Sequence, residues 1–144
     1  ARSLPLCCSG RFRVSRMPRF VILRHEPPVG SRRPRHWDLM LESGDVLRTW
    51  ALAESPAAGQ PIAAEALADH RTAYLDYEGP VSGDRGAVHR WDAGTFQWES
   101  NTACEIAVLL QGERLFGQAR LTRVAERSPS WQFVFQPAES AKLF

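Results

Sequence analysis

The chain has 144 residues, of which 44% are hydrophobic and 24% charged, so it is long enough for one domain with one core and too apolar for a disordered protein. No apolar run approaches the ~20 residues of a membrane span, so we expect no membrane-spanning helix. The net charge of +2 hides an asymmetry, because residues 1–35 hold nine Arg and one acid. This region favours an anionic partner such as nucleic acid, and a solvated basic tail is the equal alternative.

The three cysteines, Cys7, Cys8 and Cys104, are odd in number and lack the spacing of a zinc site. We therefore expect no disulfide framework and a reducing compartment such as the cytoplasm. Met17 resembles a natural translation start. We expect residues 1–16 to be a disordered extension, residues 17–137 to form the folded domain and residues 138–144 to be a loose tail.

The first half of the chain predicts strands joined by short loops. Residues 19–25 are β-branched and aromatic, which is typical of a strand, and the Pro/Gly/Arg-rich residues 26–35 predict a loop. Residues 36–42 alternate strictly, and Gly44 favours a hairpin turn into a strand over residues 46–52.

The alternating strand carries an unusual polar face. His36, Asp38, Met40 and Glu42 share one side, and His36 and Asp38 lie about 7 Å apart along an extended strand. That spacing lets both side chains converge on one ion or one phosphate. The alternative is a half-exposed strand whose polar face meets solvent.

The second half predicts further hairpins. Residues 62–70 fit either a short helix or a strand, and residues 71–77 fit a helical turn. The remaining predicted strands cover residues 87–91, 95–99, 105–111, 115–124 and 131–136, with turns at residues 92–94 and 112–114. Seven or eight short strands at ~10-residue spacing predict a mainly β fold, an antiparallel barrel or sandwich, with one or two short helices.

His25 ends the first predicted strand and His36 opens the second. If these strands are neighbours, His25, His36 and Asp38 form a set of two imidazoles and a carboxylate. Such a set suits Mn²⁺, Zn²⁺ or Fe²⁺. The spacing alone is not a compact ligand motif, so it leaves the metal site open.

Several segments in order resemble the 3′-phosphoesterase domain of bacterial DNA ligase D. They are RFVILRH, HWDLMLESGDVLRTWAL, DHRTAYLDYEG and WDAGTF, and the resemblance runs from about residue 19 to about residue 135. It implies a single small antiparallel β-barrel with a concave active site. It also implies a divalent-metal-dependent activity, typically with Mn²⁺ and otherwise with Zn²⁺ or Co²⁺. That activity removes a 3′-terminal ribonucleoside from DNA and then the remaining 3′-phosphate.

The resemblance also implies roles for individual residues. The metal-binding set falls on His25, His36 and Asp38, and the phosphate-contacting pair falls on His70 and Tyr74.

The chain departs from the family at positions whose side chains contact the phosphate. Met40 stands where the family has an Arg, and Glu54 stands where it has a Lys. Met offers no hydrogen-bond donor to a phosphate. Arginines elsewhere are candidate replacements and DNA contacts: Arg32, Arg33, Arg35, Arg48 and Arg85.

The sequence therefore predicts a stand-alone, divergent phosphoesterase of DNA 3′ ends, with a weakened or lost phosphomonoesterase step. We expect it to be a monomer that does not bind membranes, with a repair ligase or polymerase as a candidate protein partner. The alternative is a metal-binding or DNA-end-binding module without turnover, which Met40 and Glu54 favour.

Overall fold

The computed structural model describes residues 16–57 and 59–138. The expected extension and tail, apart from Arg16 and Ala138, lie outside these residues. The strands are β1 (Arg19–Glu26), β2 (His36–Ser43), β3 (Val46–Leu52), β4 (Ile62–Arg71), β5 (Gly79–Pro80), β6 (Ala87–Asn101), β7 (Glu105–Gly112), β8 (Phe116–Arg123) and β9 (Ser130–Pro137). Among the described residues one 3₁₀ turn, η2 (Thr72–Leu75), follows β4. In the part of the chain that is described, no helix is long and apolar enough to cross a membrane.

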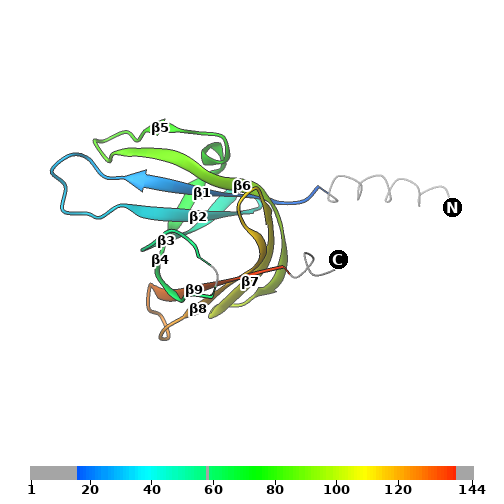
Figure 1. Cartoon of the computed structure of the whole chain (residues 1–144). Coiled ribbons are helices and arrows are strands. Elements are labelled where there is room, and N and C mark those ends of the chain that lie inside the picture. Colours follow the sequence, from blue (N-terminus) through cyan, green and yellow to red (C-terminus); the bar gives the residue numbers. More distant parts are fainter. Residues whose placement is uncertain (1–15, 58, 139–144) are drawn as a thin grey trace.

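The strands form one antiparallel sheet that closes on itself. Their order is β1-β2-β3-β4-β9-β8-β7-β6-β5, and β1 also pairs with β6. This pairing makes a closed barrel of eight strands, with β5 attached outside β6 (Figure 1). The prediction of a single-domain antiparallel barrel is confirmed. Closure also leaves fewer free strand edges for unwanted pairing.

Alternation along the strands builds two apolar clusters on opposite faces of the barrel wall. Phe20 and Leu39 belong to the large cluster, which also contains Trp50, Phe96 and Phe133. Their neighbours Val21 and Met40 belong to a second cluster with Leu23, Leu47, Leu75, Val81 and Val88. The second cluster lies on the outer face, where η2 and the β5 segment cover β1 and β6 (Figure 1). The face of β2 that carries His36, Asp38, Met40 and Glu42 is buried, so the alternative of a polar face that meets solvent is wrong.

Two local predictions in the first half are settled by the sheet. Gly44 has φ +65° in the β2–β3 hairpin, as its turn position requires. Residues 62–70 are strand β4, because pairing with β3 and β9 overrides the helix propensity of their Ala and Leu residues.

The predicted turn at residues 92–94 is wrong, because β6 runs without a break from Ala87 to Asn101. Asp92 has only 3% of its surface exposed, and its carboxylate accepts backbone N–H groups of Glu113, Arg114 and Leu115 at 2.8, 3.0 and 2.9 Å. Gly94 allows close strand approach, since a Cβ there would lie 2.0 Å from the Gln111 oxygen. Asp92 therefore binds the neighbouring β7–β8 turn, and Gly94 lets β6 approach the end of β7 closely.

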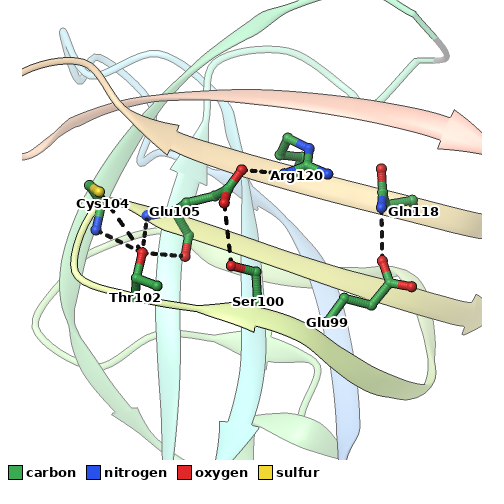
Figure 2. Close-up of polar contacts among 7 residues, drawn as sticks. All are labelled: Glu99, Ser100, Thr102, Cys104, Glu105, Gln118 and Arg120. Atoms are coloured by element: carbon green, nitrogen blue, oxygen red, sulfur yellow. Dashed lines mark hydrogen bonds and ion pairs between the residues drawn. The ribbon is translucent and has the colours of Figure 1, made fainter.

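Side chains of β6, β7 and β8 form a polar network (Figure 2). Glu105 accepts hydrogen bonds from Ser100 and Arg120. Gln118 donates to Glu99 at 2.8 Å. These groups are exposed or partly exposed, and such contacts contribute little to stability.

Candidate metal and phosphate site

Strand register places three candidate metal ligands side by side on the outer face. β1 and β2 are antiparallel, with His25 opposite His36 and Leu23 opposite Asp38. His25 Nδ1 lies 3.2 Å from Asp38 Oδ2, and His36 Nε2 lies 3.2 Å from Asp38 Oδ1. One donor atom from each residue lies within 4.8 Å of the others. The strands thus bring the predicted set together.

The second nitrogen of each imidazole faces a backbone carbonyl. His25 Nε2 lies 2.7 Å from the Arg85 oxygen, and His36 Nδ1 lies 3.2 Å from the Pro34 oxygen. Carbonyls accept hydrogen bonds, so each contact favours a proton on that nitrogen and a lone pair on the other. Such outer contacts orient histidine ligands in metal sites.

Asp38 has an oxygen that the protein leaves without a hydrogen bond. The residue is 2% exposed, and its Oδ1 atom has no hydrogen-bond partner among the described residues, because His36 Nε2 is close but poorly aligned. A buried carboxylate oxygen without a partner is costly. A divalent cation would satisfy it, so the donor set fits a metal ion.

The charges of the site reinforce one another. Burial raises the pKa of Asp38, but the neighbouring imidazoles of His25 and His36 outweigh it and hold the pKa below its ordinary value. The hydrogen bond to Asp38 raises the pKa of His25, and burial and the positive charge of Arg33 only partly oppose that rise. Asp38 is thus ionised over the physiological range and attracts a cation.

Two connected hollows open beside these ligands. The first, of about 340 Å³, and the second, of about 300 Å³, share His25, Asp38, His70 and Arg85 in their walls. A ligand in either hollow therefore meets the histidine and the carboxylate of the donor set. We call the two hollows together the central cavity.

His70 and Tyr74 approach the same cavity from the other side. His70 lies near the end of β4 and Tyr74 lies in η2, and their ring centroids are 5.6 Å apart. Both line the first hollow. His70 Nδ1 lies 2.9 Å from the Ala68 oxygen, which favours a proton there and leaves Nε2 for a ligand.

The five candidate arginines separate into two groups. Arg33 and Arg85 line the second hollow, and Arg85 also lines the first. Arg35 pairs with Glu26 at 2.8 Å and lines an adjoining groove. Arg32 is exposed and lines neither hollow, and Arg48 stacks on Trp50 and donates to Asn101, away from the donor set. The structure thus does not bring Arg32 or Arg48 into the cavity.

The cavity also contains Met40, which the resemblance singled out as a departure at the place of an expected Arg. Met40 is 1% exposed and lines the first hollow from the second apolar cluster. Asp69 and Arg71, which the sequence did not single out, line the same hollow beside His70. The only sequence signal for Arg71 was its place directly after a candidate site histidine.

Glu42 lies at the far end of the same β2 face and does not join the donor set. Its carboxylate accepts the Arg19 N–H at 2.8 Å and pairs with Arg16 at 3.0 Å. These two arginines therefore occupy the Glu42 carboxylate.

A comparison with protein-family models matches residues 29–123 to the family described as the DNA Ligase D 3′-phosphoesterase domain. No curated protein matches the chain. The matched residues include His36, Asp38, His70 and Tyr74, whereas His25 lies before them. The place of His25 in the donor set therefore depends on the pairing of β1 with β2.

Proposed function

The chain belongs to the DNA ligase D 3′-phosphoesterase family, and on this premise we propose that it is a divalent-metal-dependent phosphoesterase of DNA 3′ ends. Its reactions would be removal of a 3′-terminal ribonucleoside and of a 3′-phosphate. The observation that carries the proposal is the convergence of His25, His36 and Asp38 beside the hollow lined by His70 and Tyr74. Mn²⁺ is the metal we favour, with Zn²⁺ and Co²⁺ as alternatives, since all three accept mixed imidazole and carboxylate ligands.

The donor set would hold the metal through His25 Nδ1, His36 Nε2 and a carboxylate oxygen of Asp38. When bound, a divalent ion supplies charge stabilisation at a phosphate oxygen and lowers the pKa of a bound water. The carbonyls of Arg85 and Pro34 hold the opposite nitrogens.

His70 and Tyr74 would act on the substrate directly. His70 Nε2 is oriented to bind a phosphate oxygen or to give a proton to the leaving oxygen, a role that an imidazole suits near neutral pH. The Tyr74 hydroxyl would donate a hydrogen bond to a non-bridging oxygen. Arg71 and Arg85 line the hollow that holds His70 and Tyr74, and Arg33 lines the second hollow, so these guanidinium groups are available to a phosphate there.

Met40 bears on which reaction is retained. A terminal phosphomonoester carries more negative charge than a diester, so it depends more on a donor at this position. Because Met40 supplies none, we propose that removal of a 3′-phosphate is slower than cleavage of the diester.

Basic residues around the cavity entrance would bind the DNA backbone. Arg33 and Arg35 line a groove of about 630 Å³ that begins at His36, and Arg32 is exposed in the same loop. Contacts of this kind release counterions, so DNA binding should weaken steeply with salt. A repair ligase or polymerase is the protein partner we propose for a monomer of this chain.

A second candidate function is a metal-binding or DNA-end-binding module without turnover. Met40 is buried in an apolar cluster, and Glu54 is exposed where the family has a Lys. Both changes remove positive charge from phosphate recognition.

The test uses a primer–template with either a 3′-terminal ribonucleotide or a 3′-phosphate, with Mn²⁺ or with chelator. The enzyme predicts metal-dependent shortening that His36→Ala abolishes. DNA binding without product in any metal would reject the enzyme in favour of the module. An equally active His36→Ala variant would reject the proposed site.

A further inference from the structure

A third hollow adjoins the central cavity at Tyr74. Its volume is about 250 Å³, and its walls are Arg71, Ala73, Tyr74, Tyr77, Pro80, Val81 and Ser82. Arg71, Tyr74 and Val81 also line the first hollow. A group bound beside His70 therefore has this hollow, which we call the tyrosine pocket, directly next to it.

The two tyrosines of the pocket stand almost at right angles. Their ring centroids are 5.9 Å apart with an interplanar angle of 88°. The Tyr77 hydroxyl donates to the Pro80 oxygen, which fixes its ring, yet 37% of the residue remains exposed. A planar ring in this pocket can stack on one tyrosine and meet the other edge-on, and aromatic rings favour both arrangements.

The groove on the opposite side of the metal ligands is different. It is larger, about 630 Å³, and the described residues of its wall include Arg33, Arg35 and one carboxylate, Glu65, but no Phe, Tyr or Trp. A basic groove without aromatic side chains suits a phosphate backbone, whereas an aromatic pocket suits a base. The tyrosine pocket is also smaller than the ~300–1,000 Å³ of ordinary ligand sites, which limits it to about one ring system.

We propose that the tyrosine pocket holds the base of the 3′-terminal nucleoside while its phosphodiester lies beside His70. This inference rests on the proposed function and adds the substrate's orientation: the terminal base at Tyr77 and the upstream strand in the Arg33 groove. Arg71 and Ser82 supply polar groups at the pocket wall for the edge of the base or the sugar.

The experiment measures binding in chelator, where hydrolysis does not contribute. A 5′-fluorescent DNA oligonucleotide with one 3′-terminal ribonucleoside is compared, by anisotropy, with the same oligonucleotide ending in an abasic ribose. We expect the base to tighten binding about 10-fold, as stacking on one aromatic side chain does. Tyr77→Leu should remove this preference and leave the affinity for the abasic oligonucleotide unchanged.

Two variants separate stacking from a general structural effect. Tyr77→Phe keeps the ring and loses the hydrogen bond to Pro80, so the base preference should remain. Phe116→Leu removes another exposed aromatic, 51% accessible on β8, and should change neither affinity.

Four results would overturn the inference: equal affinity of the wild type for the two oligonucleotides, no binding of either, equal weakening of both by Tyr77→Leu, or a loss of preference in Tyr77→Phe as large as in Tyr77→Leu. The outcome is independent of turnover. A base preference in a protein without hydrolytic activity would reject only the enzyme, and hydrolysis that is indifferent to the base would reject only the pocket.

Discussion

Two buried aspartates of the barrel are used in opposite ways. Asp38 is 2% exposed and Asp92 is 3% exposed, so both carboxylates are removed from water to the same degree. Asp92 accepts backbone N–H groups at both oxygens, three of them from the β7–β8 turn. Asp38 faces two imidazoles and retains one oxygen without a hydrogen bond.

The difference shows how burial alone misleads about function. Backbone donors come from the fold itself, so a carboxylate that they saturate stabilises a turn and has no capacity for a ligand. Imidazoles are exchangeable donors that also bind metals, and a cation would satisfy a carboxylate oxygen that lies unpaired beside them. The contrast predicts that substitutions of Asp38 affect activity and substitutions of Asp92 affect folding.

The largest expected effect is on catalysis. Asp38→Asn should lower kcat/KM for a 3′-ribonucleotide substrate by about 10³-fold, because metal-assisted charge stabilisation is worth several kcal/mol and each ~1.4 kcal/mol is tenfold. The free energy of unfolding in chelator should change by less than about 1 kcal/mol, since removing a buried charge offsets the lost ion pair. Steady-state kinetics and urea unfolding measure the two quantities. A large loss of stability with retained activity would reverse the assignment.

Asp92→Asn should destabilise the protein by about 3 kcal/mol, because its amide group presents a donor to buried N–H groups that then lose their acceptor. The expected readout is a lower urea midpoint, with unchanged kcat/KM of the folded protein in the absence of urea. Glu105→Gln is the matched control, since this carboxylate pairs with Arg120 (Figure 2) and the two side chains are 38% and 42% exposed. Glu105→Gln should lower the free energy of unfolding by less than about 1 kcal/mol. Equal effects of the two variants would contradict the structural role of Asp92.

Metal binding itself should stabilise the fold. Mn²⁺ at about 100 times its Kd should raise the free energy of unfolding by about 2.7 kcal/mol, because the ion binds only the folded donor set. Chelator should remove the gain, and Asp38→Asn should show none. Glu105→Gln should keep the full gain, so a Mn²⁺ effect that survives in Asp38→Asn would point to a site elsewhere.

The barrel was predictable because its signals are local. The alternation of residues 36–42, the Gly44 turn and the Gly112 turn each specify a strand or a hairpin from a few neighbouring residues. Asp92 and Gly94 carried the same local turn signal, and it failed because their partners lie about 20 residues further along the chain. Turn residues thus predict a turn only where their polar groups do not bind residues far along the chain.

The candidate site was predictable to the extent that it lies on strands. His25, His36 and Asp38 follow from register, once β1 and β2 pair. The cavity's remaining wall comes from the end of β4, from η2 and from the loop at Arg85, whose carbonyl contacts His25. Alternation along β3 and β4 does not say where these strands lie relative to the cavity, so neither the place of Arg71 nor the exclusion of Arg48 was visible before the fold was known.

The smallest expected effect is a change in how the free energy of unfolding depends on pH. The pKa of His25 is raised in the folded protein, so in chelator its pair with Asp38 stabilises the fold fully at pH values below the pKa of ~6.5 of an unfolded histidine. This stabilisation is lost as the pH rises through the pKa of His25 in the folded protein. The lowered pKa of Asp38 has the opposite sign, so its contribution is present above the ~3.9 of an unfolded aspartate and disappears as pH falls through the folded pKa.

The His25–Asp38 pair therefore contributes most to the free energy of unfolding between about pH 4 and pH 6.5. In chelator, the free energy of unfolding of the wild type, relative to His25→Gln, should decline as the pH rises from about 6.5 through the raised pKa of His25. With Mn²⁺ this difference in the free energy of unfolding should instead increase with pH, because the metal binds the neutral imidazole and competes with its proton. Urea unfolding at a series of pH values with and without Mn²⁺ measures both slopes. Parallel slopes in the two conditions would mean that His25 does not bind the metal, even if Asp38 does.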